Sequence, residues 1–156
     1  MGNFASRVIW NEVHDIEGGG SLEDLNANPL EDLVIPVELD PDAVLPDYPS
    51  TGAASMDLFP TQPVELAPGI PKVVDIGLKL ELPYLLCAHI TGTRSLAERR
   101  VTAHAEFLGC DDRESVHVLL TLAPGAEPLE LPVHDPIAHL TVLPIARPAL
   151  QRRVEL

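Results

Sequence analysis

Residues 45–58 read LPDYPSTGAASMDL, and the rest of the chain is interpreted from this stretch outward. From residue 44 onward, short apolar runs alternate with turn residues such as Pro68-Gly69 and Pro124-Gly125. Short runs bounded by proline and glycine are typical of strands rather than helices. A helix is expected only at 95–100. The predicted strands are 44–48, 54–59, 62–67, 70–81, 84–92, 100–109, 115–122, 128–133 and 137–145.

The overall composition agrees with an all-β domain. The chain has 156 residues, enough for one domain with a buried core. Hydrophobic residues make up 46% of it and aromatic residues only 4%, and sixteen prolines interrupt the sequence. Many short strands at even spacing predict a jelly-roll-like β-barrel.

The N-terminal part differs from the rest in charge. Residues 1–47 hold eleven acids and one base, Arg7, whereas the whole chain has a formal net charge of −14. We interpret residues 1–42 as an extended acidic arm and residues 43–156 as the barrel domain. The acidity either serves solubility or docks the arm on a basic partner.

Several classes of function are not expected. Nucleic-acid binding requires clustered Lys and Arg, which this acidic chain lacks. The two cysteines, Cys87 and Cys110, are too few for a disulfide framework, and no apolar run is as long as a membrane span. The start of the chain matches the short N-myristoylation pattern at Gly2, which is a weak signal. We therefore expect neither a nucleic-acid nor a membrane partner.

Four segments in order resemble the motifs of the dUTPase family, and the related dCTP deaminases share the same barrel. The resemblance spans roughly residues 44–145 and implies a dUTPase-like β-barrel (a β-clip fold) that assembles as a homotrimer. The matching segments are GAASMDL at 52–58, TRSLA at 93–97, the stretch 106–120, and DPIAHL at 135–140.

The resemblance also implies a set of nucleotide-binding residues. Arg94 and Ser95 match the phosphate-contacting pair of the second motif, and Asp57 and Asp135 match the aspartates of the first and fourth. Family members hydrolyse dUTP to dUMP and pyrophosphate with Mg²⁺, for which Asp57 would be the metal-binding residue here. A third-motif aspartate takes the proton of the attacking water.

At the third motif the sequence departs from the family. Gly109 stands where the general base is expected, and Asp112 stands where the family has a tyrosine that stacks on the deoxyribose. The glycine after Ser95 is missing, and no glycine follows Gly125, so the glycine-rich fifth motif is absent. A shift of two residues would make Asp111 the base.

These losses lead to the hypothesis of a non-enzymatic structural trimer without catalytic residues, metal or cofactor. In this hypothesis the chain decorates a virus or phage capsid lattice, anchored by residues 1–42, and is located in the virion. Two alternatives stay open. One is a divergent dUTP pyrophosphatase in the cytoplasm, with Asp111 as base and Mg²⁺ as cofactor. The other is a regulatory module that binds nucleotide through Arg94 and Ser95 without turnover.

Overall fold

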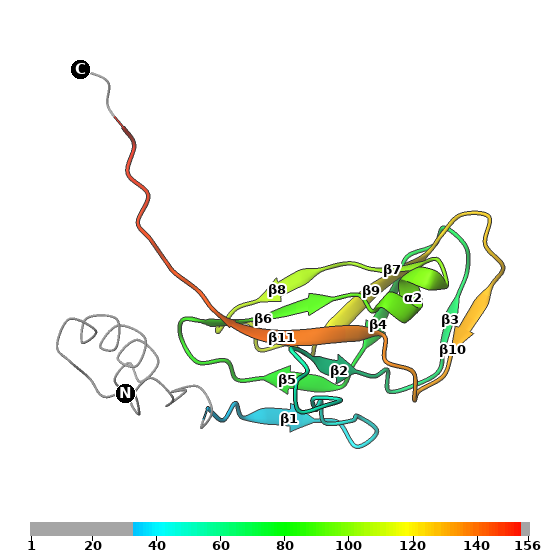
Figure 1. Ribbon diagram of the computed structural model, residues 1–156, viewed down its shortest axis with the longest axis horizontal. Helices are drawn as coiled ribbons and strands as arrows, with labels where there is room; N and C mark the ends of the chain where they lie inside the picture. Colours follow the sequence, from blue (N-terminus) through cyan, green and yellow to red (C-terminus); the bar gives the residue numbers. More distant parts are fainter. Residues whose placement is uncertain (1–32, 154–156) are drawn as a thin grey trace.

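The computed structural model describes residues 33–153 and consists almost entirely of antiparallel strands (Figure 1). The all-β prediction is confirmed. The single helix of this part of the chain, α2 (Arg94–Glu98), lies where a helix was predicted. The strands are β1 (Val37–Leu39), β2 (Met56–Leu58), β3 (Val64–Leu66), β4 (Lys72–Asp75), β5 (Leu78–Leu80), β6 (Leu86–Thr91), β7 (Val101–Ala103), β8 (Glu106–Leu108), β9 (His117–Leu122), β10 (Leu129–Leu131) and β11 (Ala138–Pro144).

Two larger sheets and two short ribbons enclose one core. The larger sheets have the strand orders β2-β11-β6-β8 and β4-β9-β7, and the ribbons are β1-β5 and β10-β3. Inward-facing leucines, isoleucines and valines alternate with exposed residues along the strands, as in β3 and β5. The largest fully buried side chains include Leu58, Ile76, Leu120, Leu131 and Leu140. Burial of aliphatic side chains from every sheet stabilises the barrel.

Two long strands of the prediction are each divided in two. The segment 70–81 is interrupted at Gly77, which has a φ of +65° and whose N–H donates to Asp75 Oδ1 at 2.8 Å. The segment 100–109 is interrupted after Ala103, so that β7 pairs with β9 and β8 pairs with β6. The strand predicted at 44–48 is wrong, because this proline-containing segment forms no ladder.

The described part of the predicted arm belongs to a ribbon of the barrel. β1 lies within residues 1–42 and pairs with β5, and Ile35 and Val37 pack against the core. The remaining predictions for this segment, including Gly2, fall on residues 1–32 and lie outside the described residues. The boundary between arm and barrel therefore stays a prediction.

Candidate functional site

One row of side chains crosses three strands of the four-stranded sheet near the end of β6. The pairing of β2 with β11 places Asp57 opposite His139, and the pairing of β11 with β6 places His139 opposite Thr91. His139 Nδ1 lies 3.0 Å from Asp57 Oδ1. This contact is attractive only when Nδ1 carries a proton. Asp57 therefore shares its carboxylate with a histidine 82 positions later in the sequence.

The geometry of this pair leaves the ring nitrogen Nδ1 of His139 without a good hydrogen bond. His139 Nδ1 is buried and makes no hydrogen bond of good geometry with any described residue, in spite of the short distance to Asp57. About a third of the His139 side chain (33%) is exposed. The exposed part of the ring therefore does not include Nδ1.

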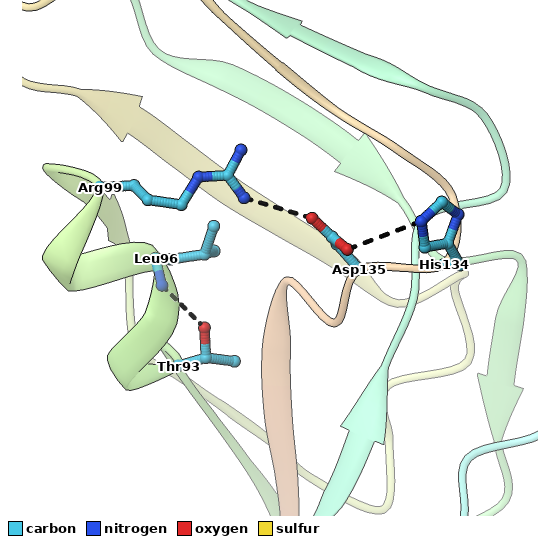
Figure 2. Close-up of polar contacts among 5 residues, drawn as sticks. All are labelled: Thr93, Leu96, Arg99, His134 and Asp135. Carbon is cyan, nitrogen blue, oxygen red and sulfur yellow. Dashed lines mark hydrogen bonds and ion pairs between the residues drawn. The ribbon is translucent and has the colours of Figure 1, made fainter.

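The helix α2 starts two residues beyond this row. Thr93 is its N-cap and is 5% exposed, and its Oγ1 accepts a hydrogen bond from the Leu96 N–H at 3.2 Å (Figure 2). Such a cap satisfies a backbone donor that the helix itself cannot. Leu96 is buried, whereas Arg94 and Ser95 in the first turn are exposed. The cap thus presents Arg94 and Ser95 to solvent at the end of β6.

An ion pair joins the end of α2 to the loop before β11. Arg99 Nη1 lies 3.2 Å from Asp135 Oδ2, and His134 Nε2 lies 3.9 Å from Asp135 Oδ1 on the other side (Figure 2). The Arg99 and Asp135 side chains are each about one-third exposed, so that solvent screens the pair. The Asp135 carboxylate therefore holds this loop against the end of α2. Arg99 was missed as its partner, because the two residues are 36 positions apart.

The structure brings the predicted residues Asp57, Arg94, Ser95 and Asp135 to one end of the four-stranded sheet. Asp135 precedes His139 by four residues, and Arg94 follows Thr91 by three residues. The strand pairing therefore places all of them around the same corner. Three of the four sequence motifs converge there.

The remaining segment, the third motif after β8, forms a tight turn at 109–112. The Gly109 N–H donates to Asp112 Oδ2 at 2.8 Å, and the Asp112 N–H donates to the Gly109 carbonyl at 3.2 Å. Asp112 is thus occupied within its own turn. Asp111 is exposed and makes no hydrogen bond with the described part of the chain. A Cβ atom placed on Gly109 would meet Asp111 Oδ1 at 2.8 Å. The Asp111 carboxylate consequently occupies the space of a side chain at position 109.

Asp111 does not join the other residues within one subunit. Leu108 at the end of β8 pairs with Ala88, and Arg94 follows Ala88 by six positions along β6 and its extension. At about 3.3 Å per strand residue this separation is roughly 20 Å. Figure 1 shows the loop after β8 at one end of the barrel and α2 at the other.

Two kinds of feature were not found in residues 33–153. No three His, Cys, Asp or Glu side chains cluster closely enough there to hold a metal ion by themselves. None of the helices in that part of the chain is long and apolar enough to span a bilayer.

Comparisons with known proteins place this site in a family. No protein-family model matches the chain. The deoxyuridine 5'-triphosphate nucleotidohydrolase of Anaeromyxobacter sp. is 35% identical to it over 113 residues, which cover 70% of this chain and 76% of that protein. The chain belongs to the dUTPase family. The enzyme of the same name from Cutibacterium acnes is 31% identical over 119 residues, covering 74% and 78% of the two chains.

Solved dUTPases have the same fold. A mutant dUTPase from phage phi11 of S. aureus matches with a TM-score of 0.74 at 14% identity, over 79% of this chain and 98% of that one. The Staphylococcus bacteriophage 80alpha dUTPase matches with a TM-score of 0.71 at 14% identity, over 79% and 97%. The dUTPase-like barrel predicted from the sequence is therefore confirmed. The predicted trimer and the N-terminal arm stay predictions.

The hypothesis of a non-enzymatic capsid decoration protein is wrong. The relatives that establish the family are named as nucleotide hydrolases, and none of those given above is named as a structural protein. The predictions of a catalytically inactive protein in the virion, anchored to a lattice, lose their support with it. That hypothesis rested on Gly109 as the loss of the general base, and the activity for which the relatives are named overturns it.

Proposed function

We propose that this dUTPase-family chain hydrolyses dUTP to dUMP and pyrophosphate. The observation that carries the proposal is the convergence of Asp57, Arg94, Ser95 and Asp135 at one corner of the sheet, although they come from three distant parts of the sequence. Relatives named as deoxyuridine 5'-triphosphate nucleotidohydrolases are identical to the chain at about a third of the aligned residues. A barrel that serves only as a structural element has no need of that convergence.

Arg94 and Ser95 are the phosphate-binding residues in this proposal. Both are exposed in the first turn of α2, whose orientation is fixed by the Thr93 cap and the buried Leu96. A guanidinium can form charge-assisted hydrogen bonds with phosphate oxygens, and a hydroxyl can donate one more. The Arg99–Asp135 pair holds the β11 side of the corner against the helix and so acts as a positioning pair.

Asp111 is the general base. The carboxylates of Asp57, Asp112 and Asp135 each lie against a polar partner, whereas Asp111 is free to accept a proton. A water molecule attacks the α-phosphorus, its proton passes to the Asp111 carboxylate, and the bond from that phosphorus to the α–β bridging oxygen breaks. Pyrophosphate leaves with the bridging oxygen and its electron pair, and dUMP remains.

A second copy of the chain has to supply part of this site. The base and the phosphate-binding residues must both reach one phosphate chain, yet strand register separates them by roughly 20 Å in one subunit. Closed rotational symmetry repeats the same contact in every subunit, so that each copy can lend its Asp111 turn to the α2 corner of its neighbour. We propose the homotrimer as this assembly.

Mg²⁺ is the cofactor in this proposal, and the residues present fit a limited role for it. Mg²⁺ in nucleotide sites is bound by one or two carboxylates together with substrate phosphates and water, so a dedicated protein cage is not required. Asp57, 20% exposed at the phosphate corner, is the carboxylate that would contact its coordination shell. The ion would neutralise charge on the triphosphate. The solved phage phi11 dUTPase is described as coordinating a structural Mg(II) ion.

Pyrophosphate release from dUTP in the presence of Mg²⁺ tests the proposal. The full chain should release pyrophosphate, and Asp111→Asn should lower kcat by at least about 100-fold, because general-base catalysis contributes factors of roughly 10² to 10⁴. Asp112→Asn is the matched control in the same turn. Gly109→Asp combined with Asp111→Ala should restore turnover, since the space beside residue 109 is then free for the new carboxylate.

Two results would contradict this account. Wild-type protein that binds dUTP without turnover is a nucleotide-binding module instead of an enzyme. Wild-type protein that turns over dUTP equally well after Asp111→Asn has another base. We propose the cytoplasm as the location of the enzyme, because its nucleotide substrate is available there.

A further inference from the structure

An apolar groove with a volume of about 350 Å³ lies beside β1 and is lined by residues of β1, β2 and β11. Its walls are hydrophobic apart from one tyrosine, and they include Ile35, Val37, Leu45, Tyr48, Met56 and Val142. Leu45 is 57% exposed and Tyr48 is 50% exposed. A contiguous apolar surface of this kind marks a contact with another segment or molecule.

The described chain enters the barrel at this groove. It begins at Leu33, and Leu33, Ile35 and Val37 line the groove at alternate positions of the segment that leads into β1 (Figure 1). Residues 145–153, which follow the groove residue Pro144, are exposed and lead away from the barrel. An occupant from the same chain therefore has to come from the residues before Leu33.

One segment before Leu33 matches the groove in composition. Residues 4–10 read FASRVIW, and they combine two aromatic and two β-branched side chains without an acidic residue. Such side chains favour extended segments and bury large apolar areas. Residues 11–32 hold seven acids and no base, so burial against an apolar wall would be costly for them.

Charge also favours residues 4–10 as the occupant. Arg7 is the single base among residues 1–47. Asp47, between the groove residues Pro46 and Tyr48, is exposed and makes no ion pair with another described residue. An arginine near Asp47 would be attracted, whereas the acids of residues 11–32 would be repelled.

The length of the connection allows this contact. Residues 11–32 separate the segment from Leu33, and a chain of this length extends over as much as about 70 Å. Attachment to the same chain keeps the segment at a high effective concentration near the groove. The contact therefore does not require high affinity.

We propose that residues 4–10 bind in this groove of their own chain, with Trp10 against the apolar walls and Arg7 toward Asp47. The segment then covers the exposed apolar surface beside β1. Neither the groove nor residues 4–10 contain a residue of the proposed catalytic site, so this contact is independent of the proposed function.

Tryptophan fluorescence of the full chain tests this contact, because Trp10 is the only tryptophan. In the native protein, the emission should lie at shorter wavelength than in the urea-unfolded chain, and acrylamide should quench it less. Leu45→Lys puts a charge on the groove wall and should move both quantities toward their unfolded values. Val73→Lys, at a residue of β4 that is similarly exposed (61%), is the matched control and should change neither. Circular dichroism checks the fold of both variants.

A second pair of variants changes only the segment. Arg7→Glu should increase acrylamide quenching of Trp10, because it replaces attraction to Asp47 by repulsion, and Arg7→Lys should keep the protection. Native emission and quenching equal to those of the unfolded chain would overturn the proposal. A protected Trp10 that does not respond to Leu45→Lys would also overturn it, since the ring is then buried elsewhere. Protection lost on dilution of a folded protein would assign the segment to the groove of a second copy and refute binding within one chain.

Discussion

Ser115 makes the shortest side-chain hydrogen bond of the described barrel, and its removal gives a prediction that depends on pH. Ser115 Oγ donates to Asp75 Oδ1 at 2.6 Å, and the Gly77 N–H donates to the same oxygen at 2.8 Å. These bonds join the start of β9 to the turn between β4 and β5. They lower the pKa of Asp75 below its ordinary value of 3.8, with the Ser115 hydrogen bond as the largest cause.

The magnitude follows from the exposure of the pair. A hydrogen bond to a charged group contributes about 1.5–3 kcal/mol, but Asp75 is exposed and solvent replaces part of the loss. Ser115→Ala should therefore lower the free energy of unfolding by about 1 kcal/mol at neutral pH. Because the folded pKa of Asp75 is depressed, this stabilisation is complete above pH 3.8 and is lost as the pH falls through the folded pKa.

Urea unfolding at pH 7 and at pH 3 measures the effect. The difference between wild type and Ser115→Ala should shrink at the lower pH, and a double-mutant cycle with Asp75→Asn should give a coupling energy of about 1 kcal/mol. Ser50→Ala, at another exposed serine, is the control and should be neutral at both pH values. Equal losses at both pH values, or strict additivity with Asp75→Asn, would refute the reasoning.

Three further predictions concern the backbone, the core and the cofactor. Arg100 has a φ of +62°, which disfavours non-glycine residues by about 1–2 kcal/mol. Glycine loses more backbone entropy on folding, so Arg100→Gly should raise the free energy of unfolding by only about 0.5–1 kcal/mol. A lower thermal midpoint of the variant would contradict this prediction. Leu58 is fully buried, and Leu58→Ala should cost about 2–5 kcal/mol in urea unfolding, whereas a loss below about 1 kcal/mol would mean that the core repacks. Chelation with EDTA should end pyrophosphate release and added Mg²⁺ should restore it; release that persists in EDTA would exclude the proposed cofactor.

The strands of the barrel were largely predictable because local chemistry sets them. Alternation of apolar and polar residues and the turn pair Pro68-Gly69 mark most elements, and the short helix followed from the 95–100 segment. The divisions at Gly77 and after Ala103 were not predicted, since both depend on which strand each half pairs with. Register between distant strands is a tertiary property that local periodicity does not determine.

The members of the proposed site come from the resemblance, whereas the contacts between them could not be predicted from the sequence. Resemblance named Asp57, Arg94, Ser95 and Asp135, and the structure brings them to one corner. The partners His139 and Arg99 depend on contacts across 82 and 36 positions, which no local pattern reports. The non-enzymatic prediction failed because it gave the glycine at position 109 more weight than the rest of the resemblance. In the folded turn the Asp111 carboxylate lies beside that glycine, and it is the base that we propose.

Subunit mixing tests most directly whether a site shared between copies hydrolyses dUTP. Asp111→Asn and Arg94→Ala proteins should each be inactive alone. When the two are unfolded together and refolded as a one-to-one mixture, about a quarter of the shared sites combine an intact Asp111 with an intact Arg94 from different copies. Pyrophosphate release is then expected to return to about a quarter of the wild-type rate, as each intact site acts independently. A mixture that stays inactive although wild-type protein treated in the same way recovers its activity would contradict the shared site.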